Sequence, residues 1–337
     1  MTELIPDLPE EIALDCLTRL HYTTHPVASL VCKNWNHLLQ SKHFYYHRKQ
    51  SSQTHKAACL IQLLPAISAS KPVCPPRYGV TLCDPINGIW ERFELVPEYP
   101  DGLPLFCQVT SSEGKLLVIG GWDPVSYEPV SYVFVYDFIT GIWRQGKDMP
   151  ESRSFFAVGE LNGRVIIAGG HNMNKTALSS AWSYDVSQDE WTELPRMSQE
   201  RDECEGVVIG SEFWVVSGYQ TDSQGRFEGS AEVIESGASE WRRVEDAWKD
   251  AAVNRSPKSC IGVDKGGKLL SWAEADSEVK FGACGVQSGE WALVSGSAYQ
   301  GGAQGFFLKE GQDGKWKRLN VPEEFSGFVQ SGCSVEI

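Results

Sequence analysis

The sequence lacks the features that tie a chain to a membrane, a secretory route or a disulfide framework. Its 337 residues contain no run near the roughly 18 apolar residues that a membrane-spanning helix needs. No cationic stretch followed by an apolar run opens the chain, so we expect no secretory signal. None of the ten cysteines forms a C-x-x-C pair, and we expect most to be small buried apolar side chains. We therefore expect a cytoplasmic or nuclear protein.

Basic charge is also in short supply. The chain has 30 Lys and Arg against 44 Asp and Glu, a formal net charge of −14. This balance argues against binding to nucleic acid or to an anionic membrane, because neutralising phosphates requires an excess of basic groups. Residues 1–50 carry five acidic and five basic side chains, so the whole deficit lies in residues 51–337. We infer two parts with different surfaces.

Groups for catalysis or metal binding are few. Six of the seven histidines lie at or before position 55, and His171 is the exception. The i,i+4 pairs His21–His25 and His43–His47 have a spacing that can bind zinc, but a site needs a third ligand. A copper or iron site needs several converging ligands, and we find no nucleophile elbow and no phosphate loop. We expect no catalytic residue, no metal and no cofactor.

The segment LPEEIALDCLTRL, residues 8–20, predicts a short amphipathic helix. Pro9 suits the first helical position, and Glu10 and Glu11 complement the helix dipole in the first turn. At 100° per residue, an arc of about 140° holds most of the apolar side chains. These are Ile12, Ala13, Cys16, Leu17 and Leu20, while Leu14 falls off the arc.

Two further helices are expected in HPVASLVCKNWNHLL, from residue 25, and in KHFYYHRKQ, from residue 42. The first has a one-sided apolar stripe of Val27, Leu30, Val31, Trp35, Leu38 and Leu39. A helical unit of this size is marginal alone, so its apolar faces need cover. Two interpretations remain open: the helices pack as a cap on the rest of the chain, or a partner protein covers them.

The remainder of the chain is periodic. The segment VFVYDFITGIWRQGKDMPESR, residues 133–153, aligns with AWSYDVSQDEWTELPRMSQER, residues 181–201. Successive tryptophans are 53, 48, 50 and 50 residues apart, at Trp90, Trp143, Trp191, Trp241 and Trp291. A period near 50 with β-type sequence indicates a propeller of four-stranded blades, because no blade can bury both faces alone.

One unit shows the expected strands. SFFAVGEL is the first strand, Asn162-Gly163 is a hairpin turn and RVIIAGG is the second. The third strand ends at Tyr184-Asp185 and the fourth starts at Trp191, which we expect to pack between neighbouring blades. The terminal SGFVQSGCSVEI is expected to supply a strand missing from the first unit, which includes AACLIQLL.

We count five clear units and one doubtful one, because only a truncated unit fits after Trp291. The predicted fold is mainly β, a propeller of five to six blades preceded by a small α-helical domain. We place the helical domain at 1–50, a linker containing SASKPVCPPRYG and the start of the first blade at 51–78, and the propeller at 79–337.

Propellers bind ligands on one rim through the loops between strands. The predicted rim residues follow the glycine pairs or begin the innermost strands: Trp122, Asp123, Arg153, His171, Asn172, Arg201, Asp202 and Tyr219. The charged members face either a partner or one another as salt bridges along the channel, and both interpretations remain open.

The opening segment resembles an F-box, a motif of Leu-Pro, an acidic pair, an aliphatic helix and a Val-Cys-Lys-x-Trp helix. The matching residues are Leu8, Pro9, Glu10, Ile12, Leu17, Val31, Cys32, Lys33, Trp35, Leu38 and Phe44. The resemblance implies binding to a Skp-type adaptor and, through it, to a cullin in a ubiquitin ligase. It assigns the adaptor contacts to Leu8, Pro9, Ile12, Leu17, Val31, Cys32 and Trp35.

The units resemble kelch repeats, and the whole chain resembles the plant F-box/kelch-repeat proteins. Three segments, DGLPLFCQV, ERDEC and SGFVQSGC, resemble the subgroup that brings phenylalanine ammonia-lyase to degradation and so restrains phenylpropanoid synthesis. The resemblance implies a non-catalytic adaptor that holds this target. Three alternatives remain: an adaptor for a response regulator of hormone signalling, a kelch-propeller enzyme acting on a small molecule, or a scaffold whose helices bind another partner.

Overall fold

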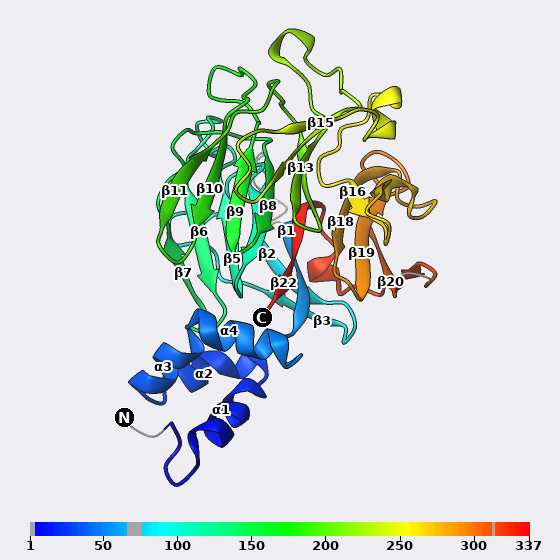
Figure 1. Cartoon of the computed structure of the whole chain (residues 1–337). Helices are drawn as coiled ribbons and strands as arrows, with labels where there is room; N and C mark the ends of the chain where they lie inside the picture. The colour runs from blue at the N-terminus through cyan, green and yellow to red at the C-terminus, as the bar shows by residue number, and fades with distance from the viewer. Residues whose placement is uncertain (1–3, 66–75, 312–313) are drawn as a thin grey trace.

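The computed structural model describes residues 4–65, 76–311 and 314–337, with four α-helices below a ring of β-sheets (Figure 1). The helical elements are α1 (Glu10–Thr18), η1 (Tyr22–Thr24), α2 (His25–Ser29), α3 (Lys33–Leu39) and α4 (Lys42–Gln50). None of the helices in the described part of the chain has the length and apolar character that crossing a membrane requires.

The single helix predicted from residue 25 is two helices. Cys32 has an extended backbone, with φ −159° and ψ 165°, and its Sγ accepts a hydrogen bond from the Trp35 N–H at 3.5 Å. This cap starts α3 and ends the continuation of α2, because the extended backbone of Cys32 interrupts the helical angles. The break turns Leu30 and Val31 into a connection rather than a helical stripe.

The helices pack around a small apolar core, against which Ile139 of the ring also packs. Leu17, Ala28, Leu39 and Phe44 are buried together, with Leu14, Leu20, Trp35 and Leu38 around them. The predicted arc on α1 was therefore partly wrong: Leu14 contributes to this core, whereas Ile12 and Cys16 are exposed. The apolar surface of α1 faces two directions, and only one of them is covered by its neighbours.

The ring consists of five four-stranded blades and one two-stranded sheet within the described residues. Blade one contains β22 (Val329–Glu336), β1 (Lys56–Leu63), β2 (Tyr78–Asp84) and β3 (Ile89–Arg92). Blade two contains β4 (Gln108–Ser112), β5 (Lys115–Ile119), β6 (Val133–Asp137) and β7 (Ile142–Gln145). Blade three contains β8 (Ala157–Leu161), β9 (Arg164–Ala168), β10 (Ala181–Asp185) and β11 (Glu190–Leu194).

The second half of the ring is less regular. Blade four contains β12 (Glu205–Ile209), β13 (Glu212–Val216), β14 (Ala231–Glu235) and β15 (Arg242–Val244). The two-stranded sheet follows, with β16 (Ile261–Val263) and β17 (Leu269–Ser271). Blade five contains β18 (Phe281–Gln287), β19 (Trp291–Ser297), β20 (Gly305–Glu310) and β21 (Lys317–Arg318). Short 3₁₀ turns lie at η2 (Thr221–Ser223), η3 (Lys249–Val253), η4 (Trp272–Glu274) and η5 (Glu323–Phe325).

The C-terminal strand closes the ring as predicted. β22 pairs with β1 from Lys56↔Glu336 to Gln62↔Val329 and forms the inner edge of blade one. The predicted hairpin turn is also confirmed, because Asn162 and Gly163 have φ of 53° and 77° between β8 and β9. β1, at Lys56–Leu63, lies within residues 51–78, the range predicted to contain the linker and the start of the first blade. Residues 66–75 of the predicted linker lie outside the described residues.

The periodic tryptophans pack between blades, with one exception. The indole N–H groups of Trp143, Trp191 and Trp241 donate to backbone carbonyls that follow the preceding blade's outer strand: Glu94, Lys147 and Pro195 at 2.7–2.9 Å. Trp291 instead begins β19, a second strand, and Trp316 is the residue that precedes the outer strand of blade five. The truncated unit is therefore the sheet of β16 and β17, and the expected truncation after Trp291 was wrong.

Candidate functional site

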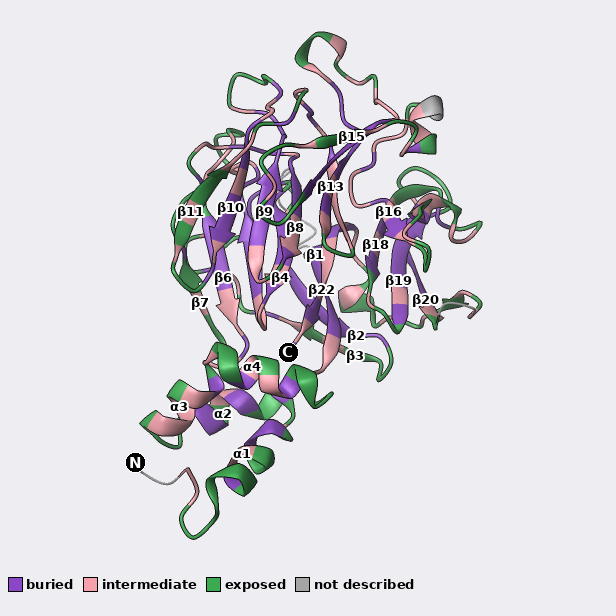
Figure 2. Cartoon of the chain, in the orientation of Figure 1, coloured by how far each residue is buried: buried purple, intermediate pink, exposed green. Residues whose placement is uncertain are grey.

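An exposed apolar surface lies on the helical domain. It comprises five large side chains, which we call the docking face: Leu8, Ile12, Val27, Leu30 and Val31. Leu30 is 84% exposed and Val27 is 70% exposed, although both are apolar and lie within a helical domain. Figure 2 shows that α1, the helix farthest from the ring, has extensive exposed surface. Large apolar side chains left exposed together on one small domain are typical of an interaction surface.

The predicted adaptor contacts divide into two groups. Leu8, Pro9, Ile12, Val31 and Cys32 are exposed and available to a partner. Leu17 is buried in the helical core, so its predicted direct contact is corrected to a supporting role. Trp35 is half-buried, and its indole N–H donates to the Leu4 carbonyl at 2.6 Å, which fixes the chain just before Leu8.

The sequence interpretation did not assign Val27 and Leu30 to the adaptor, although it placed both in the apolar stripe. Val27 lies on the face of α2 opposite the helical core, into which Ala28 points, and Leu30 lies in the connection between α2 and α3. The sequence carries no strong signal for the break between these helices, because cysteine is not among the residues that favour an N-cap position, although Cys32 fills one here.

The helical domain attaches to the ring through α4 and its surroundings. Lys42 pairs with Glu113 at 2.9 Å, and Lys49 pairs with Glu336 on β22 at 2.9 Å. The Tyr46 hydroxyl also donates to Glu113 at 3.1 Å. The docking face is separate from these attachments, so the ring leaves it uncovered.

Arg48 holds the helical domain together from inside. Its guanidinium donates to the carbonyls of Thr18, Leu20 and Gln53 at 2.7–3.2 Å. It also donates to His25 Nε2 at 3.1 Å, which requires a neutral imidazole. Burial, followed by the charge of Arg48, lowers the pKa of His25 to about 4.

At the opposite end of the ring, the predicted rim residues form a chain of hydrogen bonds across blades two, three and four. The Trp122 indole N–H donates to Ser154 Oγ at 2.6 Å, and Ser154 Oγ lies 2.9 Å from His171 Nε2. His171 Nδ1 lies 2.8 Å from Asp202 Oδ2. Since the ionised Asp202 carboxylate can only accept, Nδ1–H of His171 donates to it. In the neutral imidazole Nε2 is then an acceptor, and the Ser154 hydroxyl donates to Nε2 while its oxygen accepts from the indole N–H.

The order serine, imidazole, carboxylate is that of a hydrolase triad. Ser154 is fully buried, however, and Trp122 already occupies its oxygen, so a substrate carbonyl has no path to this hydroxyl. The described residues contain no group of three His, Cys, Asp or Glu side chains positioned to hold a metal ion. This arrangement orients the rim loops rather than performing nucleophilic chemistry.

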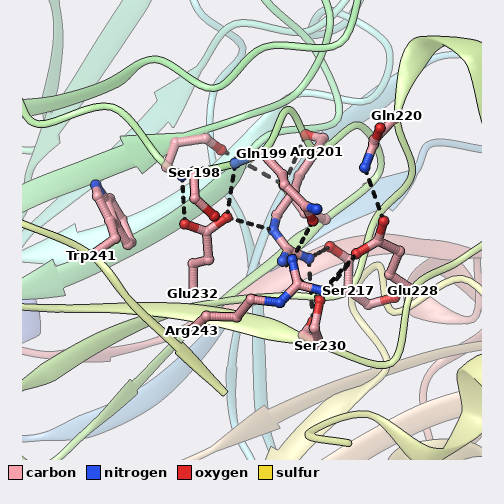
Figure 3. A network of polar contacts seen from close by, with 12 residues as sticks. Ser198, Gln199, Arg201, Ser217, Gln220, Glu228, Ser230, Glu232, Trp241 and Arg243 are labelled. Atoms are coloured by element: carbon pink, nitrogen blue, oxygen red, sulfur yellow. Dashed lines mark hydrogen bonds and ion pairs between the residues drawn. The ribbon is translucent and has the colours of Figure 1, made fainter. Parts of the chain in front are cut away.

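The two predicted arginines are buried between blade loops. Arg201 donates to the carbonyls of Ser217 and Ser230 and pairs with Glu232 at 3.3 Å (Figure 3). Arg153 repeats this arrangement one blade earlier, donating to the carbonyls of Gly169 and Ser180 at 3.1 Å. Both are less than 2% exposed, so the expected partner contact is corrected and the salt-bridge interpretation holds for Arg201.

The remaining predicted rim residues differ in access. Asp123 and Asn172 are half-buried and accept hydrogen bonds from their own loops. Tyr219 is buried, and its hydroxyl donates to Glu203 at 3.0 Å. Burial raises the pKa of Glu203. These residues shape the rim, while Trp122, Asp123 and Asn172 keep part of their surface exposed.

The sequence interpretation missed two aromatic residues at the channel mouth. Phe106 and Phe155 stand just before the innermost strands β4 and β8, with φ of 57° and 56° and ring centroids 4.8 Å apart. Glu203 and Ser259 take the same left-handed backbone before β12 and β16. Non-glycine residues in this region are uncommon and gather at functional sites. The available signal was their identical place in successive units.

Lys258 crosses the channel at the same level. Its Nζ donates to Gln108 Oε1 and to the carbonyls of Phe156 and Cys204 at 2.8–3.1 Å. The Phe106 N–H donates to Gln330 Oε1 at 2.9 Å. Residues from blades one, two, three and four therefore converge on one mouth.

Comparison with known proteins agrees with this two-part architecture. The F-box domain model matches residues 5–47, and the kelch motif model matches residues 105–150 and 152–198. Two F-box/kelch-repeat proteins of Arabidopsis thaliana are 34% and 33% identical, each over 99% of this chain and 100% of their own length. The F-box/kelch-repeat protein SKIP20 of Arabidopsis thaliana is 29% identical over 99% of this chain and 97% of its own. Among solved structures, YjhT aligns with a TM-score of 0.45 and 12% identity, over 74% of this chain and 80% of its own.

Proposed function

The chain belongs to the F-box/kelch-repeat proteins, and from this premise we propose that it is the substrate-recognition subunit of a Skp–cullin–F-box ubiquitin ligase. In this role the helical domain binds a Skp-type adaptor, which connects it to a cullin, and the ring holds a target protein. The chain itself performs no bond chemistry. It acts by raising the effective concentration of the target near the ubiquitin-transfer machinery.

The observation that carries this proposal is the docking face. Its five apolar side chains are covered neither by the helical core nor by the ring, although the same helical domain buries Leu17 and Phe44. An apolar surface of this size is costly to leave in water, so a second subunit that covers it gains binding free energy. The adaptor is the partner that the F-box implies.

The rim at the channel mouth is the proposed target surface. Trp122, Asp123, Asn172 and Phe106 supply its exposed or half-buried side chains. The chain of Ser154, His171 and Asp202 holds the loops behind them, and the buried arginines hold the loops from below. We propose that the target contacts the first group and that the second group positions it.

We propose phenylalanine ammonia-lyase as the target, which makes the protein a regulator of phenylpropanoid synthesis in the cytoplasm or nucleus. Three segments support this choice, because DGLPLFCQV, ERDEC and SGFVQSGC resemble the corresponding subgroup. The three segments also meet at the rim. The Phe106 N–H donates to the Gln330 side chain, and the Lys258 ammonium donates to both the Cys204 carbonyl and the Gln108 side chain, which connects their segments. Segments that are distant in sequence and share one surface are suited to a common partner.

Adaptor binding is tested by capture of a purified Skp-type adaptor on the immobilised full chain. The double variant Ile12→Asp with Val31→Asp places two charges in the docking face and is expected to lower capture at least tenfold. Both side chains are exposed, so the fold stays intact. Val125→Asp, at an exposed loop of the ring, is the matched control and keeps full capture. Undiminished capture by the double variant contradicts the proposed function.

Target binding is tested with purified phenylalanine ammonia-lyase. Phe106→Asn keeps a residue type that tolerates positive φ and removes the aromatic ring, and it is expected to weaken binding. Ile142→Asn, an exposed substitution on the outer strand β7, is the control and leaves binding unchanged. No binding by the wild type rejects this target, whereas equal binding by all three proteins rejects Phe106 as part of the contact surface.

A further inference from the structure

The sheet of β16 and β17 occupies one full position in the ring with half the usual strands. In the ring, β16 contacts β12 of blade four on one side and β18 of blade five on the other. Among the described residues, the other five sheets each have two further strands outside this level. The position therefore lacks the two outer strands that would cover β17 and the neighbouring blades.

The outer edge of β17 presents unpaired backbone groups. β16 and β17 pair through Asp264 N–H to the Lys268 carbonyl at 2.9 Å and Trp272 N–H to the Cys260 carbonyl at 2.8 Å. In an antiparallel pair of strands, residue pairs that hydrogen-bond to each other alternate with pairs whose backbone N–H and C=O groups point away from the partner strand. Val263 is such a residue, because its N–H and carbonyl bond the Gln287 side chain instead.

Its register partner Leu269 therefore points its N–H and carbonyl to the opposite edge, and Ser271 does the same two residues on. No hydrogen bond joins these backbone groups to another group in the described part of the chain. An exposed strand edge of this kind is a template for a further strand.

Two clefts flank β17. One has a volume of about 510 Å³ and is lined by the three tryptophans Trp272, Trp291 and Trp316 on the side of blade five. The other has a volume of about 410 Å³ and lies on the side of blade four. Leu270, Ser271 and Glu274 line both, so the two clefts meet at the edge of β17.

Acidic residues outnumber basic ones in both clefts, and the clefts differ mainly in their apolar walls. The cleft beside blade four contains four acidic residues and two basic ones: Glu245, Asp246, Asp250, Glu274, Lys249 and Lys268. The cleft beside blade five contains three acidic residues and two basic ones, Asp264, Glu274, Glu290, Lys265 and Lys309. It also has the wall of three tryptophans and Leu270, which is 39% exposed. Successive side chains of an added strand point to opposite faces, so they enter the two clefts alternately.

We propose that the β17 edge binds an extended segment of the target protein by strand addition, with large apolar or aromatic side chains alternating with Lys or Arg. The apolar side chains enter the tryptophan-lined cleft beside blade five. The basic ones enter the cleft beside blade four, which contains four acidic residues. Backbone pairing with Leu269 and Ser271 supplies affinity, and the alternation supplies specificity. The inference rests on the proposed function, because the partner is the target that the ring holds.

The test uses the full chain and a fluorescein-labelled heptapeptide in which tryptophan alternates with lysine, followed by fluorescence anisotropy. Ser271→Pro removes the outward N–H and blocks the edge, while the backbone φ of −93° at this residue lies near the range of proline. It is expected to weaken peptide binding about fivefold or more. Ser271→Ala removes only the hydroxyl that donates to Asp250 at 2.7 Å and is the matched control.

A second readout is hydrogen exchange. The peptide is expected to slow exchange of the Leu269 and Ser271 amides, whereas a version N-methylated at its edge-facing amides slows neither. Equal affinity for Ser271→Pro and Ser271→Ala, or no peptide binding by the wild type, overturns the inference. Adaptor capture is measured on the same samples: if it persists, only the strand-addition site fails, and if the wild type captures no adaptor, the proposed function fails.

Discussion

Arg201 shows how a single buried charge depends on its partner. The guanidinium and the Glu232 carboxylate are both fully enclosed, and Glu232 also accepts the N–H groups of Ser198 and Gln199 (Figure 3). Taking charges out of water is costly, so the pair is stable only while both members and their hydrogen bonds are present. Arg153 has a partly exposed partner, Glu151, and is less dependent on it.

We predict that Arg201→Met lowers the free energy of unfolding by about 3–5 kcal/mol, because it leaves the Glu232 charge buried without a counter-charge. Adding Glu232→Gln removes that charge and is expected to recover part of the loss. Urea unfolding followed by tryptophan fluorescence measures both. A free energy of unfolding for Arg201→Met within about 1 kcal/mol of the wild type contradicts this account of the pair.

Ser217 is a second residue whose local environment lowers the stability of the fold. It stands where blades two and three have Gly120 and Gly169, and it shares their left-handed backbone with φ of 61°. Its buried hydroxyl has no hydrogen-bond partner. Both features are unfavourable for a residue with a side chain.

We therefore predict that Ser217→Gly stabilises the protein by about 1–2 kcal/mol, since it removes the backbone strain and the unpaired hydroxyl. Its carbonyl still accepts from Arg201, because glycine keeps the backbone. Thermal unfolding measures the shift. Ser183→Gly, in the middle of β10, is the control and is expected to destabilise. A lower melting temperature for Ser217→Gly rejects the argument.

At the scale of the element, the contact between α2 and α4 is sensitive to pH. His25 is buried, and its pKa falls to about 4 mainly through burial and then through Arg48. His21 also disfavours a charge there. The unfolded chain takes up a proton near pH 6.5, which the native helices reject until about pH 4.

This difference in pKa between the folded and unfolded chain sets the direction in which stability changes with pH. His25 contributes its full stability above about pH 6.5, and the contribution falls by roughly 3 kcal/mol as pH drops towards 4. Urea unfolding followed by circular dichroism at a series of pH values measures the loss. His25→Gln is expected to flatten the pH dependence, and the exposed His37→Gln to retain it. Equal slopes for both variants contradict the assignment to His25.

Elements with local signals could be predicted from the sequence. Asn162-Gly163 specifies its turn by backbone preference, and the blade-packing tryptophans by their spacing. The closure by β22 follows because an incomplete first unit and an extra terminal strand complete each other. The prediction from tryptophan spacing was wrong at Trp291. The two-stranded sheet of β16 and β17 lies between Trp241 and Trp291, so the interval is still 50 residues although Trp291 stands on a different strand of its blade.

The candidate site was harder to predict for a physical reason. A family motif mixes residues that build the helices with residues that touch a partner, and only packing separates Leu17 from Ile12. The rim residues divide in the same way, since Arg201 and Asp202 are buried and Trp122 is not. The open edge of β17 could not be predicted from the sequence, because it results from the absence of two strands and no sequence pattern marks it.

At the scale of the whole molecule, the two surfaces lie at opposite ends of one connected body. The docking face is on the helices, and the rim is at the far end of the ring from α4 (Figure 1). Lys42, Lys49 and Tyr46 fix the helices to the ring through Glu113 and Glu336. In the proposed function, this arrangement keeps the proposed target surface at the rim apart from the proposed adaptor surface on the helices.

Hydrogen exchange of the full chain, with and without a purified Skp-type adaptor, tests this central claim most directly. The account predicts slower exchange in residues 8–16 and 27–35, which carry the docking face, and unchanged exchange at the rim residues 104–107 and 153–156. Unchanged exchange over the docking face at saturating adaptor, or slower exchange at the rim, contradicts it.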